Sequence, residues 1–159
     1  MNVQLHKVDR MVAIEHAIVE AGECINAGAY CAALAKLRRV LDLWSARYRD
    51  EHGMTFGGKK RDSLYWRLKK IAEENKLYGA TIHALMHELR LDANVTLHDE
   101  PICQPAEPKN YDAIALEGLR RPYREFIAKV VDLVSATTPG WTPMSTEGTK
   151  RYPIGGTPK

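Results

Sequence analysis

Apolar residues recur at intervals of three and four positions along most of the chain, a spacing that places them on one face of an α-helix. This pattern predicts helices over about 8–26, 30–50, 63–76, 80–98 and 110–134. The apolar faces of the first two helices are Met11, Ile14, Ile18, Ala21 and Ile25, then Tyr30, Leu34, Leu37, Leu41, Trp44 and Tyr48. No useful length of sequence alternates between apolar and polar residues as a β-strand would. The sequence therefore predicts an all-α protein, a bundle of four to five helices.

Glycine and polar capping residues mark the ends of these helices. Gly28 can adopt the left-handed conformation that ends the first helix, so that the first two helices form an antiparallel hairpin. Asp62 or Ser63 is expected to cap the third helix. Tyr78-Gly79 is expected to separate the third helix from the fourth, and Asn110 to cap the fifth.

Proline divides the second half of the chain. Pro101, Pro105 and Pro108 predict a surface loop over 99–110, and Pro122 predicts a kink or a split within the fifth helix. From residue 139 onward the sequence is rich in Gly, Pro, Thr and basic residues. We therefore expect a helical bundle domain over 1–138 and a basic tail over 139–159, in which exposed Trp141 and Tyr152 would suit docking onto a second subunit.

The composition is that of one globular domain, with 159 residues of which 45% are hydrophobic and 27% are charged. The net charge of +3 neither requires nor excludes a nucleic-acid partner. No signal peptide is readable, and no apolar run approaches the ~20 residues of a membrane span. Cys24, Cys31 and Cys103 lack CxxC spacing, so we expect reduced thiols that serve as small core residues. These features predict a cytoplasmic protein that does not enter a membrane and needs no cofactor.

Basic residues cluster in the loop after the second helix and on the third helix. The helical pattern directs Arg67, Lys69 and Lys70 outward, with Tyr65 and Trp66 interleaved among them. Basic side chains with aromatic neighbours are typical of surfaces that contact phosphates and stack on bases, although a solvated helix face has the same composition. The candidate nucleic-acid-binding residues are Lys59, Lys60, Arg61, Arg67 and Lys70.

Two other patterns have structural interpretations. The stretch 53–60 nearly matches the phosphate-binding loop G-x-x-x-x-G-K-[ST], but a helix rather than a strand precedes it, and Lys60 replaces the required hydroxyl. In the second helix, at least one of Arg38 and Arg39 is expected to lie beside the apolar face, where a structural salt bridge would join it to Asp42 or to an acid on a neighbouring helix.

His83 and His87 lie four residues apart on the fourth helix, a spacing that can bring two imidazoles to one metal ion. The Glu of the H-E-x-x-H motif is missing between them. Partly exposed or packed histidines are the simpler interpretation, and a metal-binding helical protein is the weakest of three functional hypotheses.

The polar group Arg90, Asn94 and His98 ends the fourth helix, and its spacing resembles a pattern of the HEPN superfamily (higher eukaryote and prokaryote nucleotide-binding domains). One branch has the pattern R-x-x-G-N-x-A-A-H, and all three residues stand at the required offsets. Ala93 replaces the usual Gly, and Thr96 and Leu97 replace the two Ala. The segment 32–42 is similar to the second helix of that branch, and the resemblance spans roughly residues 10–135.

This resemblance implies an all-α bundle, a homodimer and, in active members, metal-free endoribonuclease chemistry with RNA as the partner. His98 would move protons at the 2′-hydroxyl or the leaving oxygen, and Arg90 would stabilise the charged phosphorane. Asn94 would orient either partner or the phosphate. The catalytic form usually has four to six residues between Arg and His, whereas seven separate them here.

The same residues also fit a non-catalytic role. Asn94 can cap the helix end, Arg90 can pair with a nearby acid such as Asp92, and His98 can bond to a backbone carbonyl. The chain would then be a helical module that binds another protein or a second copy of itself.

Overall fold

The computed structural model describes residues 2–55, 63–89 and 112–141, and their side chains from Arg10 onward. Five α-helices make up this part of the chain, which contains no strand. They are α1 (Asn2–Asn26), α2 (Tyr30–Glu51), α3 (Leu64–Glu74), α4 (Lys76–Glu88) and α5 (Ala113–Thr137). The predicted all-α bundle is therefore confirmed. Among these helices, none is both long and apolar enough to cross a bilayer.

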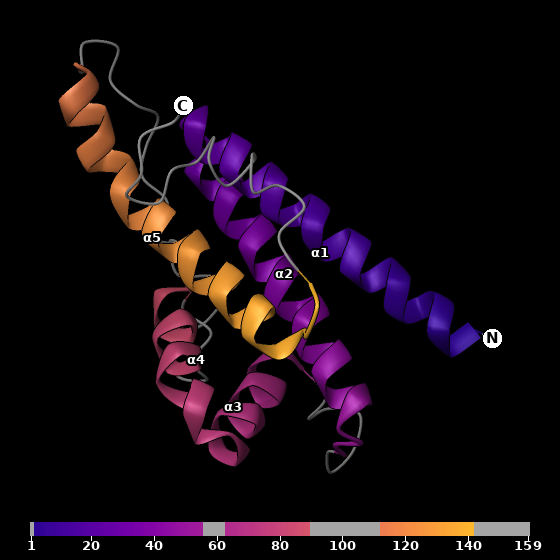
Figure 1. The fold of residues 1–159 in the computed structure, drawn as a ribbon. Coiled ribbons are helices and arrows are strands. Elements are labelled where there is room, and N and C mark those ends of the chain that lie inside the picture. The colour runs from indigo at the N-terminus through magenta and orange to yellow at the C-terminus, as the bar shows by residue number, and fades with distance from the viewer. Residues whose placement is uncertain (1, 56–62, 90–111, 142–159) are drawn as a thin grey trace.

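Helix α2 lies at the centre of the bundle. It runs antiparallel to α1, and α3 and α5 also pack against it (Figure 1). Helix α4 packs between α3 and α5, while the N-terminal end of α1 and the first turns of α5 project beyond the bundle (Figure 1). All six residues of the predicted apolar face of α2 are buried, so this face of α2 is part of the hydrophobic core.

Glycine ends each of the two helices of the first hairpin. Gly28 has a φ of 76°, its N–H donates to the carbonyl of Ile25, and the N–H of Ala29 donates to that of Cys24. The same pair of bonds forms after α2, where Gly53 has a φ of 59°. Both are Schellman motifs, which only glycine enters without strain.

The boundaries of α3, α4 and α5 correct the sequence predictions in part. Ser63 caps α3 through its side chain, as expected, but the break before α4 lies at Asn75, which caps α4. Gly79 lies inside α4, where a Cβ would come within 3.1 Å of the carbonyl oxygen of Ala72. The glycine therefore allows close packing of two helices instead of ending one.

Helix α5 continues through Pro122 without a split and is capped by Asp112, whose carboxylate accepts from the N–H of Ala115. Proline deprives the carbonyl four residues earlier, that of Gly118, of its helical hydrogen bond. Gly118 is exposed, so water can satisfy that carbonyl. Asn110, the expected cap, lies outside the described residues.

Trp141 and Cys31 differ from expectation. Trp141 is half-buried against the core, and its indole N–H donates to Glu15 at 2.6 Å, so the chain covers it without a second subunit. Cys24 packs against the core as a free thiol, as predicted. Cys31 is exposed and disulfide-bonded, which corrects the expected reduced thiol. Cys103 and Tyr152 lie outside the described residues.

A small ion network joins α1 to the end of α2. Asp50 accepts from Arg10 at 2.5 Å and from Arg49 at 3.0 Å. Burial raises the pKa of Asp50, but the hydrogen bonds and charges of the two arginines outweigh this effect and lower the pKa below 3.8. The stabilisation is thus complete above the pKa of the unfolded chain and is lost as pH falls through the lower pKa of the folded state.

We expect Asp50→Asn to lower the free energy of unfolding at pH 7 by less than about 1 kcal/mol, because the carboxylate is partly exposed. Urea unfolding at pH 7 and pH 3 measures the effect. The difference between wild type and variant should shrink at pH 3, and a difference that grows on acidification would contradict the assigned network.

Candidate nucleic-acid interface

Six of the eight residues assigned to a site from the sequence lie outside the described part of the chain: Arg90, Asn94, His98, Lys59, Lys60 and Arg61. Arg67 and Lys70 lie within it, both on α3. Their surroundings, and those of the neighbouring basic residues, define what this side of the bundle can bind.

Arg67 is buried, with 6% of its surface exposed, which corrects its predicted outward orientation. Its Nε donates to the hydroxyl of Ser45 at 3.0 Å, and its Nη2 donates to the carboxylate of Asp42. Residues three and four apart share a helix face, so Arg67 lies on the same face as Leu64 and Ile71. The guanidinium of Arg67 therefore joins α3 to α2. Contacts with a ligand at the surface must come from other residues.

Lys70 is also tied to the bundle. Its ammonium donates to the backbone carbonyl of Thr55 at 2.7 Å and lies 4.0 Å from the carboxylate of Glu74. The side chain is 36% exposed. Lys70 therefore joins the segment that follows α2 to α3, and these contacts limit its freedom to bind a ligand.

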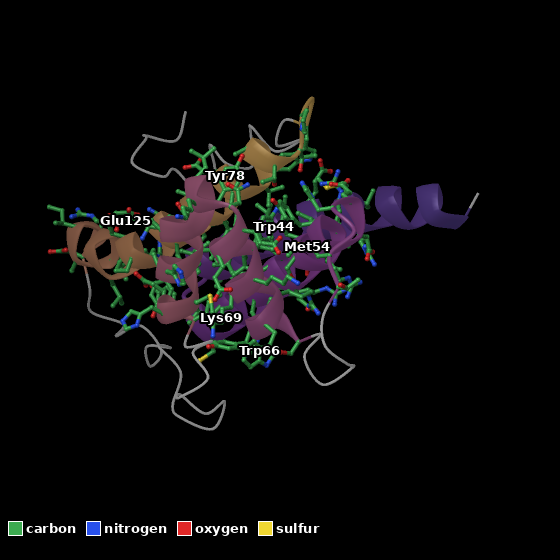
Figure 2. The ribbon with its side chains drawn as sticks, turned by 90° about the horizontal axis from the view of Figure 1, so that it is seen from below. Trp44, Met54, Trp66, Lys69, Tyr78 and Glu125 are labelled. Carbon is green, nitrogen blue, oxygen red and sulfur yellow. The ribbon has the colours of Figure 1, made fainter. Side chains whose placement is uncertain are left out.

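Lys69 and two aromatic rings form a cluster on the outer side of α3. The ammonium of Lys69 lies 5.0 Å from the centroid of the Trp66 ring and 6.0 Å from that of Tyr65. The two rings meet edge to face at 5.1 Å. Figure 2 shows Lys69 and Trp66 together at the lower edge of the bundle. A cation beside two half-buried rings offers both charge and a stacking surface.

The salt bridge expected for Arg38 or Arg39 is a prediction that the structure corrects. The two residues form no ion pair within the described residues, because Asp42, their expected partner, is bonded to Arg67 from α3. Both arginines line an open hollow of about 330 Å³ between α2 and α3, together with Ala35, Asp42 and Leu64. The signal in the sequence was an excess of basic over acidic residues near Asp42.

We group two sets of residues under one name, the α2–α3 strip: Arg38 and Arg39 of α2, and Tyr65, Trp66 and Lys69 of α3. The hollow reaches Leu64, which directly precedes the two aromatic residues of the strip on α3. Lys59, Lys60 and Arg61 directly precede the Ser63 cap of α3 in the sequence.

The two histidines considered for a metal are both exposed on α4. Within residues 2–55, 63–89 and 112–141, no three His, Cys, Asp or Glu side chains gather where they could hold a metal ion. His83 and His87 are therefore joined by no third ligand from that part of the chain.

A second, smaller hollow of about 180 Å³ lies where α5 crosses α2 and α4. It is lined mainly by apolar residues: Leu34, Glu88, Gly118, Leu119, Pro122, Tyr123 and Phe126. Tyr123 also stacks on Tyr30, with ring centroids 4.3 Å apart. The projecting start of α5 carries Ile114, which is 84% exposed.

No protein-family model, no curated protein and no solved structure matches the chain.

Proposed function

We propose that this chain is an RNA-binding helical protein of HEPN-like type that contacts RNA through the α2–α3 strip. The observation that carries the proposal is the pair Arg38 and Arg39, which has no acidic partner in the described residues and faces an open hollow. Arginine without a protein partner is a ready ligand for phosphate, because its planar fork matches two phosphate oxygens.

The aromatic part of the strip supports a single-stranded ligand. Every base has a π-face that can stack on an aromatic ring, whereas a base inside a duplex is already stacked. Trp66 and Tyr65 are only half-buried, and Lys69 lies over them. Lys59, Lys60 and Arg61 would add positive charge next to this cluster along the chain.

RNA cleavage is the second half of the proposal and rests on the sequence pattern. His98 would transfer the proton, Arg90 would stabilise the phosphorane and Asn94 would orient the phosphate. Such a mechanism needs no metal ion. A homodimer would bring two copies of these residues into one assembly.

Binding is tested by fluorescence anisotropy with a labelled single-stranded RNA of about 20 nucleotides at several salt concentrations. We expect Trp66→Ala to weaken binding by about fivefold or more, the value of one lost stacking contact. Trp66→Phe keeps an aromatic ring and should bind nearly as well as wild type. Unchanged binding by both variants would remove Trp66 from the interface.

Cleavage is tested by incubating RNA with the protein in EDTA. We expect cleavage that persists in EDTA and falls at least about a hundredfold in His98→Ala, which loses the proton-transfer group. His83→Ala, a change at an exposed histidine of α4, is the matched control and should cleave normally. Cleavage that EDTA abolishes, or that survives in His98→Ala, would contradict the proposed chemistry.

A non-catalytic interaction module is the second candidate function, and the start of α5 favours it. Ile114 is exposed in the first turn of α5, four residues before Gly118, which lines the apolar hollow. The partner in this case would be a second copy of the chain. Sedimentation velocity should then show a dimer that Ile114→Lys dissociates, while a wild-type monomer at high concentration would exclude this candidate.

A further inference from the structure

The hollow between α2 and α3 has a defined charge balance. Two guanidiniums, those of Arg38 and Arg39, and one carboxylate, that of Asp42, belong to its lining. The buried Arg67 is bonded to one oxygen of that carboxylate and neutralises its charge. The lining therefore keeps an excess of two positive charges, which favours an anion.

Helix α3 adds to this preference. Its first residue, Leu64, lines the hollow, so the positive end of the helix dipole lies at the hollow's edge. The amide of Trp66 is already bonded to the Ser63 side chain, so the dipole contributes through its field. The two arginines remain the groups that can bind the anion directly.

Asp42 limits which anion fits. Its Oδ1 is bonded to Arg67, while the structure gives its Oδ2 no partner within the described residues. A carboxylate oxygen repels a phosphate but accepts a hydrogen bond from a hydroxyl. A ligand with a phosphate and a hydroxyl a few ångströms apart satisfies both kinds of group, and a ribonucleotide unit has this combination.

From this geometry we infer that the hollow is a ribonucleotide subsite, in which Arg38 and Arg39 bind the phosphate and Asp42 accepts from the ribose 2′-hydroxyl. A hollow of about 330 Å³ is at the lower end of the range for small-ligand pockets, which suits a single unit. The inference deepens the proposed function and rests on it for the source of the unit, which is either an RNA chain or a free nucleotide.

The test compares Arg38→Gln/Arg39→Gln with Lys76→Gln/Arg121→Gln, which removes two charges from exposed positions outside the hollow. Circular dichroism first establishes that both variants are folded. We expect RNA affinity to fall about tenfold or more in the first variant and less than twofold in the control. Because each lost phosphate contact on a single strand changes the salt slope by about 0.7, the slope should flatten by about 1.4.

Two further measurements test whether the bound unit is a free nucleotide or part of an RNA chain, and whether Asp42 contacts the ribose. Calorimetry with adenosine monophosphate tests a free nucleotide, and a DNA oligonucleotide of the same sequence as the RNA tests the 2′-hydroxyl. We expect wild type to prefer RNA to this DNA several-fold. Equal affinity for the two would overturn the role of Asp42.

The outcomes distinguish this inference from the proposed function. RNA binding that is equal in the arginine variant and the control would overturn the subsite and leave RNA binding in place. Binding of adenosine monophosphate that the arginine variant loses, without RNA binding, would support the subsite and overturn the RNA proposal. A protein that binds neither ligand would overturn both.

Discussion

Trp44→Ala is expected to lower the free energy of unfolding by about 3–5 kcal/mol, the usual cost of removing a buried aromatic side chain. Trp44 is 1% exposed, and its indole N–H donates to the hydroxyl of Thr137 at 2.8 Å. Its ring also lies 5.5 Å from that of Tyr48. The side chain thus fills the core beside α2 and joins α2 to the end of α5.

Urea unfolding followed by circular dichroism measures this effect. Trp44→Phe keeps most of the apolar volume and loses the indole N–H, so we expect it to cost roughly 1–2 kcal/mol. Trp66→Ala, at a half-buried position of α3, should cost less than either. A loss below about 1 kcal/mol in Trp44→Ala would contradict the central place of Trp44 in the core.

Arg67→Met is expected to lower the free energy of unfolding by about 2 kcal/mol. Methionine replaces much of the buried stem but leaves Asp42 without its ion pair and removes the bond to Ser45. Breaking a fully buried pair costs about 3–5 kcal/mol. The side chain of Asp42 is 56% exposed, so water recovers part of that cost.

Lys69→Met is the matched control, because Lys69 lies on the same helix with its ammonium over two half-buried rings. It should change the free energy of unfolding by no more than about 0.5 kcal/mol. Equal stability of Arg67→Met and wild type in urea would show that Arg67 does not fasten α3 to α2, and would reopen its assignment to the RNA-binding surface.

The helices and the core could be predicted from the sequence because their signals are local. The apolar face of α2 follows from spacing alone, and all six residues predicted for it are buried. The cap at Gly28 depends on the backbone freedom of glycine, and the cap at Ser63 depends on its side-chain oxygen. Each of these is a property of a single residue and can be read from the sequence. The role of Gly79 was predicted wrongly because it depends on a neighbouring helix: a side chain at this position would crowd the carbonyl of Ala72 on α3.

The candidate interface could be predicted only in part, because it depends on which charges pair across helices. Asp42 is four residues from Arg38 in sequence, a spacing that suggests an ion pair within α2. In the structure Asp42 is instead bonded to Arg67, 25 residues away on α3. Arg38 and Arg39 consequently line the hollow without Asp42 as an ion-pair partner. The Arg90–His98 pattern remains a prediction from the sequence.

The three tryptophans provide the most direct test of RNA binding at the α2–α3 strip. In ¹H–¹⁵N spectra, the indole N–H of Trp66 should shift as single-stranded RNA is added. The indoles of Trp44 and Trp141, bonded to Thr137 and Glu15, should stay in place. Titration of RNA that moves the Trp66 signal alone is the result predicted here. Saturating RNA that leaves Trp66 unmoved, or that shifts Trp141 in its place, would contradict the assigned surface.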